Sequence, residues 1–231
     1  MSNSKLVNYT KLSPNHSGKR THSIDRITPH CVVGQCSVET LGNIFMNTAC
    51  EASCNYGIGY DGRVLLCVDE SNRSWCSSSN ANDQRAVTIE CASDTVAPYT
   101  MNSKVYNKLI ALCVDICKRN GKTKLLWFGN EDKTLNYSPK SGEMVLTVHR
   151  WFANKSCPGD WLYNRLGNLA DEVTAQLGGK TSNKENEEMI KYGSHNTAVL
   201  AFKKQLITLY NMKIIKTKVC LLYTSPSPRD S

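Results

Sequence analysis

The chain has 231 residues, 40% of them hydrophobic, and a formal net charge of +8. This length allows one well-formed core and a small second module, and the charge favours an anionic partner such as nucleic acid, an anionic membrane or an anionic cell wall. A run of about 18 apolar residues is absent from the sequence, which excludes a membrane-spanning helix, and the N-terminal segment lacks the apolar core of a secretion signal. We therefore expect synthesis in the cytoplasm without a signal peptide.

The first half of the chain predicts an N-terminal arm, a strand, a helix and a hairpin, in that order. Residues 1–23 are polar and predict the arm. A β-branched run predicts a strand at 26–33, and the segment after it predicts a helix at 37–46. Residues 55–70 contain two apolar runs around an Asp-Gly pair, which is a strong signal for a β-hairpin.

The second half alternates strands with helices. We predict strands at 86–93 and 143–150 from their apolar, β-branched character. Apolar residues at helical spacing predict one helix at 102–120, ended by Gly121, and another at 160–177. Interspersed strands and helices indicate an α/β fold with a central mixed β-sheet flanked by helices.

Two histidines and one cysteine are candidates for a metal site. His30 and His149 lie at the ends of two predicted strands, and a short loop brings Cys157 back toward His149. Two imidazole nitrogens and one thiolate match a catalytic zinc site, with the fourth position open to water or substrate. Spacing alone is weak evidence, because a lone strand histidine is more often a structural residue. The other cysteines are expected to be small buried hydrophobic residues.

Four segments together resemble a known enzyme family. They are "TPHCVVGQ", "ASCNYGIGYDGRV", "AVTIECAS" and "TVHRWFANKSCPGDWL". In this order they resemble the zinc-dependent N-acetylmuramoyl-L-alanine amidases of type 2, which include phage endolysins and are similar to peptidoglycan recognition proteins. The resemblance covers about residues 24–178, and its most specific part is "HRWFANKSCPGD".

The resemblance implies a role for five residues. His30, His149 and Cys157 match the family's three zinc ligands. Lys155 matches a lysine that stabilises the oxyanion, and Glu90 matches the general base. Without the resemblance, Glu90 would be read as a solvent-facing strand carboxylate and Lys155 as an exposed loop lysine.

One position departs from the family pattern. Some relatives use a tyrosine as the base, and that position is Cys54 in this chain. This difference leaves Glu90 as the expected base. The flanking aromatic residues Trp151, Phe152 and Trp161 are interpreted either as sugar-stacking residues or as core residues. The Ser/Asn-rich segment 74–87 is interpreted either as the rim of a groove or as a plain loop.

The resemblance also divides the chain into regions. Residues 24–178 form the predicted zinc amidase domain, and the polar segment 179–188 is a linker. Residues 189–219 resemble the opening of a peptidoglycan-binding repeat and are expected to be a truncated cell-wall-binding module. Residues 220–231 resemble a translated sequencing adapter and are an expected artefact.

The leading functional hypothesis is hydrolysis of the amide bond between N-acetylmuramic acid and L-alanine in peptidoglycan, by a phage or prophage endolysin that reaches the cell wall after release. Zn²⁺ is the expected cofactor and peptidoglycan the expected partner, with no nucleic acid and no membrane insertion. Two alternatives remain. In the first alternative, Cys157 pairs with His149 and is the nucleophile of a cell-wall peptidase. Pro158 weakens this alternative, because it offers no N–H to an oxyanion hole. In the other alternative, the protein binds peptidoglycan without turnover.

Overall fold

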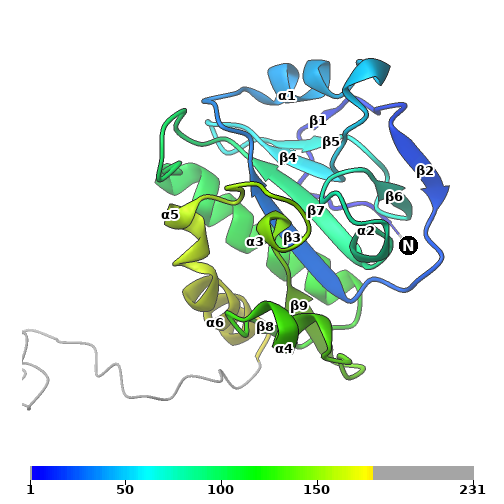
Figure 1. Cartoon of the computed structure of the whole chain (residues 1–231), viewed down its shortest axis with the longest axis vertical. Helices are drawn as coiled ribbons and strands as arrows, with labels where there is room; N and C mark the ends of the chain where they lie inside the picture. Colours follow the sequence, from blue (N-terminus) through cyan, green and yellow to red (C-terminus); the bar gives the residue numbers. More distant parts are fainter. Residues whose placement is uncertain (1, 179–231) are drawn as a thin grey trace, which may run out of the picture. The chain divides into compact units, whose positions relative to one another are not determined.

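The computed structural model describes residues 2–178. Within them, seven strands form one mixed sheet in the order β1-β5-β4-β7-β3-β9-β8 (Figure 1). These strands are β1 (Tyr9–Thr10), β3 (Arg26–Cys31), β4 (Tyr56–Ile58), β5 (Val64–Leu66), β7 (Ala86–Cys91), β8 (Lys124–Leu126) and β9 (Glu143–Leu146). Strands β2 (His16–Lys19) and β6 (Asn72–Ser74) form a separate antiparallel pair.

Helices flank the mixed sheet, as predicted for the fold class. They are α1 (Val38–Ile44), α2 (Asn80–Arg85), α3 (Ser103–Arg119), α4 (Glu131–Leu135), α5 (Asp160–Tyr163) and α6 (Leu166–Gln176), with 3-10 turns η1 (Thr48–Cys50) and η2 (His149–Trp151). Helix α3 is the longest of them, and it packs against α6, β4 and β7 (Figure 1). None of the helices in this part of the chain is long and apolar enough to cross a membrane.

Several local predictions are confirmed. The Asn102 side chain caps α3 by accepting the N–H of Val105, and the chain leaves the helix through Gly121, whose φ of +67° favours glycine. Strands β4 and β5 form the predicted antiparallel hairpin, and Gly62 in its turn has a φ of +86°.

The central strands β3 and β7 present one apolar and one polar face. Ile27 and Ile89 belong to the main core, which also contains the buried faces of α3 and α6. Successive strand residues point to opposite faces of a sheet. Thr28 and His30 of β3 therefore lie on the other face, where Glu90 of β7 is the register partner of His30. The polar face of the two central strands is where the candidate site lies.

The predicted polar arm, residues 1–23, is not free of the domain. Strand β1 pairs in parallel with β5, and β2 pairs with β6. Ser4 and Asn15 are buried, and the Asn15 amide donates to the carbonyls of Phe45, Asn47 and Ala52. The prediction was wrong because this segment is held by backbone pairing and polar contacts, which its hydrophobic content does not reveal.

Two predicted elements differ from the structure in their extent. The predicted strand at 143–150 stops at Leu146, so His149 begins the η2 turn and is not a strand residue. The predicted helix at 160–177 is divided into α5 and α6. At the division, the Arg165 guanidinium donates to the Trp161 carbonyl at 2.9 Å, and the Arg165 N–H bonds to Leu162. These contacts replace the regular helical bond at that point.

Three predicted regions lie outside the described residues. They are the linker at 179–188, the truncated cell-wall-binding module at 189–219 and the adapter-derived tail at 220–231.

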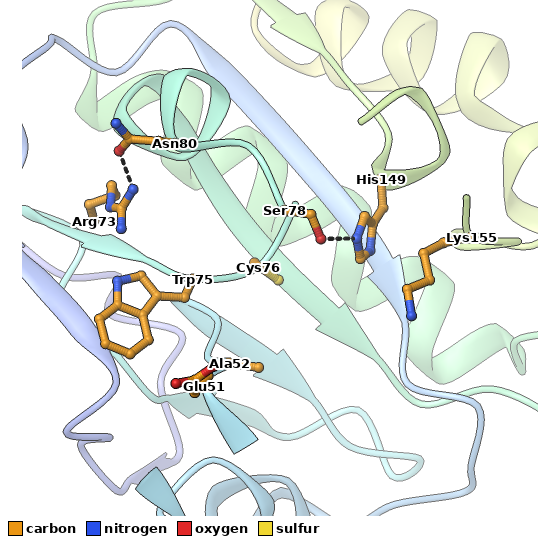
Figure 2. Close-up of a pocket in the computed structure, with 9 residues that line it drawn as sticks. All are labelled: Glu51, Ala52, Arg73, Trp75, Cys76, Ser78, Asn80, His149 and Lys155. Carbon is orange, nitrogen blue, oxygen red and sulfur yellow. Dashed lines mark hydrogen bonds between the residues drawn. The ribbon is translucent and has the colours of Figure 1, made fainter. Parts of the chain in front are cut away.

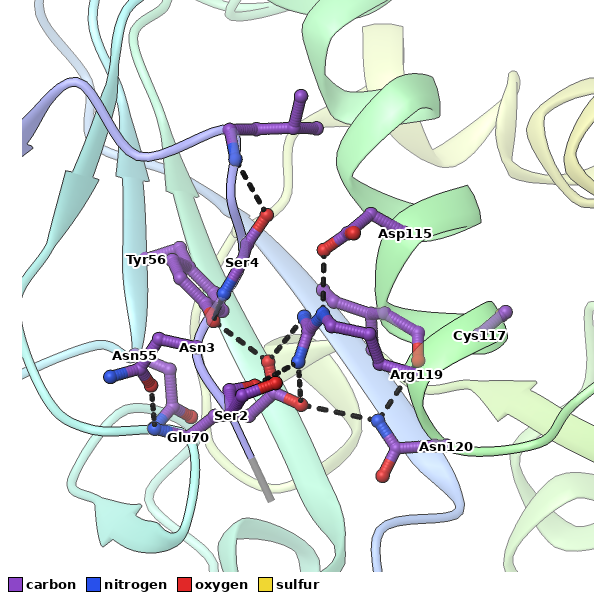
Figure 3. A network of polar contacts seen from close by, with 12 residues as sticks. Ser2, Asn3, Ser4, Asn55, Tyr56, Glu70, Asp115, Cys117, Arg119 and Asn120 are labelled. Carbon is purple, nitrogen blue, oxygen red and sulfur yellow. Dashed lines mark hydrogen bonds and ion pairs between the residues drawn. The ribbon is translucent and has the colours of Figure 1, made fainter.

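A buried ion pair ties the N-terminal segment to the domain (Figure 3). Both carboxylate oxygens of Glu70 accept from the guanidinium of Arg119, at 2.9 and 2.7 Å, and the Tyr56 hydroxyl donates to Glu70 at 2.8 Å. The Glu70 side chain is only 1% exposed. Arg119 also donates to the Ser2 carbonyl, and the Ser4 N–H donates to the Tyr56 hydroxyl. This network therefore joins the N-terminal segment, β4 and α3.

We expect Glu70→Ala to lower the free energy of unfolding by about 3 kcal/mol, because it leaves the largely buried Arg119 charge without its partner. Glu39→Ala is the matched control, since Glu39 pairs with Arg63 at an exposed position and little change is expected. Urea denaturation of both variants measures the difference. Equal losses in the two variants would contradict the assigned importance of the buried pair.

Candidate metal centre

The structure brings the three predicted metal ligands together. His30 lies near the end of β3, His149 opens η2, and Cys157 lies in the loop before α5. One ligand atom from each residue lies within 4.8 Å of the other two. The Cys157 Sγ atom is 3.3 Å from His30 Nδ1, and the two imidazole rings are 5.1 Å apart between centroids. The assignment of these residues as ligands remains a prediction.

The loop that carries Cys157 is closed by its own hydrogen bonds. The Arg150 N–H donates to the Cys157 carbonyl at 3.1 Å. The Arg150 guanidinium donates to the Ser156 carbonyl and to the Asp160 carboxylate. These contacts return the chain toward His149, which explains how residues eight positions apart reach one site.

The electrostatic setting keeps both histidines neutral. Burial, and to a smaller extent repulsion from His149 when that ring is protonated, lowers the pKa of His30 to about 3. Burial and the charge of Lys155 also lower the pKa of His149. A neutral imidazole is the form that binds a metal ion. A hydrogen bond with Cys31 and burial raise the pKa of the Cys157 thiol well above its ordinary value, so metal binding at this residue would release a proton.

Ser78 is a site residue that sequence reasoning did not single out. Its Oγ lies 3.0 Å from Nε2 of His149, so Ser78 holds one of the two ring nitrogens of this candidate ligand (Figure 2). Ser78 also has a φ of +60°, which a serine seldom adopts and which often marks a functional position. The only sequence signal was the Ser/Asn-rich character of the segment 74–87.

Glu90 lies next to the candidate ligands but outside their group. Its Oε1 is 4.0 Å from Nδ1 of His30 and 3.8 Å from Sγ of Cys76. The side chain is 14% exposed. Burial raises the pKa of Glu90 to about 7, and a hydrogen bond from Cys76 opposes this rise. A carboxylate with such a pKa suits a general base at neutral pH.

A pocket of about 410 Å³ opens beside the site. Its lining residues come from β6, α2, η2 and the neighbouring loops: Glu51, Ala52, Arg73, Trp75, Cys76, Ser78, Asn80, His149 and Lys155 (Figure 2). The segment 74–87 therefore lines a pocket, which agrees with its interpretation as the rim of a groove. Lys155 is exposed and shares this pocket with His149, so a positive charge stands near the candidate metal centre.

The predicted flanking aromatic residues are mostly part of the packing. Trp151 stacks on Trp127 with ring centroids 5.2 Å apart, and Trp161 meets Tyr106 edge to face. Both tryptophans pack against the main core. Trp75 lines the pocket instead.

Cys54 takes no part in the site. It is fully buried in a small apolar cluster that includes Val38, Leu41 and Leu65. Some relatives have a tyrosine base at this position, and in this chain the buried Cys54 supplies no base to the pocket.

The family model for N-acetylmuramoyl-L-alanine amidase matches residues 19–160. The match spans more than half of the chain, and the chain belongs to this family. The predicted family and its amide-hydrolysing activity are thereby confirmed. Among curated proteins, none matches the chain.

Solved structures show the same fold. The structure of PlyL is 14% identical, covers 76% of this chain and 98% of its own, and has a TM-score of 0.52. A mutant endolysin from Bacillus subtilis is 13% identical, covers 72% and 99%, and has a TM-score of 0.51. The catalytic domain of XlyA is 12% identical, covers 72% and 99%, and has a TM-score of 0.50. At these identities the likeness is one of fold.

We expect Ser78→Ala to weaken zinc binding by about tenfold, because the hydrogen bond that orients His149 is lost. Ser71→Ala is the matched control, since Ser71 is an exposed serine in the turn before β6. Competition with a chelator of known affinity measures both variants. The same affinity in Ser78→Ala and wild type would contradict the orienting role of Ser78.

Proposed function

We propose that this chain is a zinc-dependent N-acetylmuramoyl-L-alanine amidase that acts as an endolysin. Its reaction is hydrolysis of the amide bond between N-acetylmuramic acid and L-alanine in peptidoglycan. The observation that carries this proposal is the group formed by His30, His149 and Cys157, with the Glu90 carboxylate beside it. Family membership supports the reaction type.

The donor set fits zinc. Two imidazole nitrogens and one thiolate are common zinc ligands, and three protein ligands leave one position open, as in catalytic zinc sites. His30, His149 and Cys157 would hold the ion, and Ser78 would keep the His149 ring in place. When bound, zinc supplies Lewis acidity, which polarises a carbonyl and makes water more acidic.

Glu90 is the proposed proton carrier. Its carboxylate takes a proton from the attacking water and delivers it to the leaving L-alanine nitrogen. A pKa of about 7 lets the same group accept a proton and then donate it at neutral pH.

Lys155 is the proposed stabiliser of the oxyanion. An ammonium near the reacting carbonyl lowers the energy of negative charge that develops on its oxygen. Lys155 shares the pocket with His149, and its charge adds to burial in lowering the pKa of that histidine. The open pocket, lined by Arg73 and Trp75 as well, gives a muramoyl peptide access to the site.

The rival enzyme hypothesis makes Cys157 a nucleophile. Its thiol lies against His30, and its pKa is raised well above the ordinary value, whereas a nucleophilic cysteine needs a lowered one. Pro158 also has no N–H to donate to an oxyanion. These observations favour Cys157 as a ligand.

Removal of zinc with a chelator should abolish the clearing of cell-wall suspensions, and added zinc should restore it. The reason is that the side chains of His30, His149 and Cys157 cannot polarise the amide carbonyl without a metal ion. The product after restoration should carry new N-terminal L-alanine, which separates an amidase from a protein that only binds peptidoglycan. Unchanged clearing in excess chelator would overturn the proposal.

Glu90→Gln should lower kcat by about 10²–10⁴ while the protein still holds one zinc ion per chain, since the amide cannot accept the proton. Glu131→Gln, at an exposed position of α4, is the matched control and should keep its activity. Steady-state kinetics with metal analysis measures both. Full activity in Glu90→Gln would remove it from the mechanism.

A further inference from the structure

A second group of metal-binding side chains overlaps the first. His30, Cys76 and Glu90 each offer one ligand atom, and these atoms lie within 4.8 Å of one another. The Cys76 Sγ atom lies 3.8 Å from Glu90 Oε1, and that oxygen lies 4.0 Å from His30 Nδ1. A tetrahedral zinc ion with bonds of about 2.0–2.3 Å holds its ligand atoms about 3.3–3.8 Å apart. Small side-chain shifts therefore suffice to close the three atoms around one ion.

The carboxylate in this group lacks a partner for one oxygen. Oε2 of Glu90 is buried and has no hydrogen-bond partner among the described residues, and the same holds for Nε2 of the fully buried His30. Buried polar atoms without partners are uncommon, and an absent ion is one of the explanations for them. The Glu90 carboxylate therefore keeps Oε2 free to bind a ligand, in addition to the Oε1 atom to which the distances refer.

The thiol of Cys76 is positioned without any metal ion. The Cys76 N–H donates to Oδ2 of Asp83 at 3.0 Å, and the Ser77 hydroxyl donates to Oδ1 of the same residue at 2.6 Å. Asp83 belongs to α2, and the neighbouring Asn82 amide donates to Thr28 of β3 at 3.0 Å. Cys76 is therefore fixed to the central sheet, and its place in the pocket lining lets an ion arrive from solvent (Figure 2).

We propose that His30, Cys76 and Glu90 form a second, inhibitory position for a thiophilic divalent cation such as Zn²⁺ or Cd²⁺. The thiolate selects these ions over Mg²⁺ and Ca²⁺, which prefer oxygen ligands. The inhibitory effect of this ion rests on the proposed function. The binding site itself follows from the three donors.

The two positions compete because they share His30. Its Nδ1 atom faces Cys157 Sγ at 3.3 Å and Glu90 Oε1 at 4.0 Å, and one nitrogen lone pair binds one ion. An ion in the second position takes His30 from the first group and also occupies the carboxylate of the proposed base. When the first position is already filled, Cys76 and Glu90 still present a thiolate and a carboxylate to a second ion. Excess zinc therefore inhibits the enzyme through this second ion, which blocks the proposed base, whereas a single ion divides between the two positions in a ratio that the zinc concentration does not change.

Cobalt spectroscopy tests the site without relying on activity. Cys157→Ala removes the sulfur of the first position, so any sulfur-to-cobalt charge-transfer band that remains must come from another thiolate. We expect Cys157→Ala to show this band with Co²⁺, Cys157→Ala/Cys76→Ala to lose it, and Cys157→Ala/Cys50→Ala to keep it. Cys50 is the control because it is exposed and belongs to neither group. Absence of the band in Cys157→Ala, or its survival without Cys76, would overturn the inference.

The same titration separates this inference from the proposed function. Wild-type protein that shows no sulfur-to-cobalt band contradicts both positions, because each contains one cysteine, and a band of equal strength in wild type and Cys157→Ala contradicts the proposed zinc centre alone. A band in wild type that is absent from folded Cys157→Ala contradicts the second position alone.

A kinetic measurement keeps the inference testable if Cys157→Ala does not fold. Wild-type activity should fall about tenfold between one equivalent and a large excess of zinc, whereas Cys76→Ala should change less than about twofold, because the second ion loses its thiolate. Equal inhibition of the two proteins would count against the second position.

Discussion

The candidate site depends on the parallel pairing of β3 with β7. Six consecutive residue pairs hold the two strands in register, and this register places His30 beside Glu90. A shift by one residue would turn one of the two side chains to the opposite face, because side chains alternate along a strand. In this register the candidate metal ligand and the proposed base lie side by side on one face, and loops bring the other candidate residues to that point.

A layer of buried polar contacts connects those loops to the central strands. The Thr28 and Thr147 hydroxyls lie 2.7 Å apart, and Asn82 of α2 bonds to both. Through α2, this layer fixes the segment that carries Cys76 and Ser78. The apolar face of the same strands packs into the main core, so stability and chemistry use opposite faces of the sheet. Two candidate groups of metal donors meet at His30, one for the proposed catalytic zinc ion and one for the proposed inhibitory ion.

The sequence predicted what depends on local signals. The hairpin turn at Gly62 and the limits of α3 follow from residues within a few positions of each element. The sequence-based prediction failed where contacts between distant residues determine the structure. Strand β1 lies in a segment that was predicted to be an arm, because its partner β5 is more than fifty residues away. The five predicted site residues were named through the family resemblance, since spacing alone left their roles open. Ser78 was missed because its role depends on a contact with His149, 71 residues further along the chain.

Anomalous diffraction from a crystal of the zinc-loaded protein, recorded at the zinc absorption edge, tests the central claim most directly. The account predicts one strong peak about 2.0–2.3 Å from a ring nitrogen of His30, a ring nitrogen of His149 and the sulfur of Cys157. A peak away from these three side chains, or no peak from protein loaded with one equivalent of zinc, would contradict it.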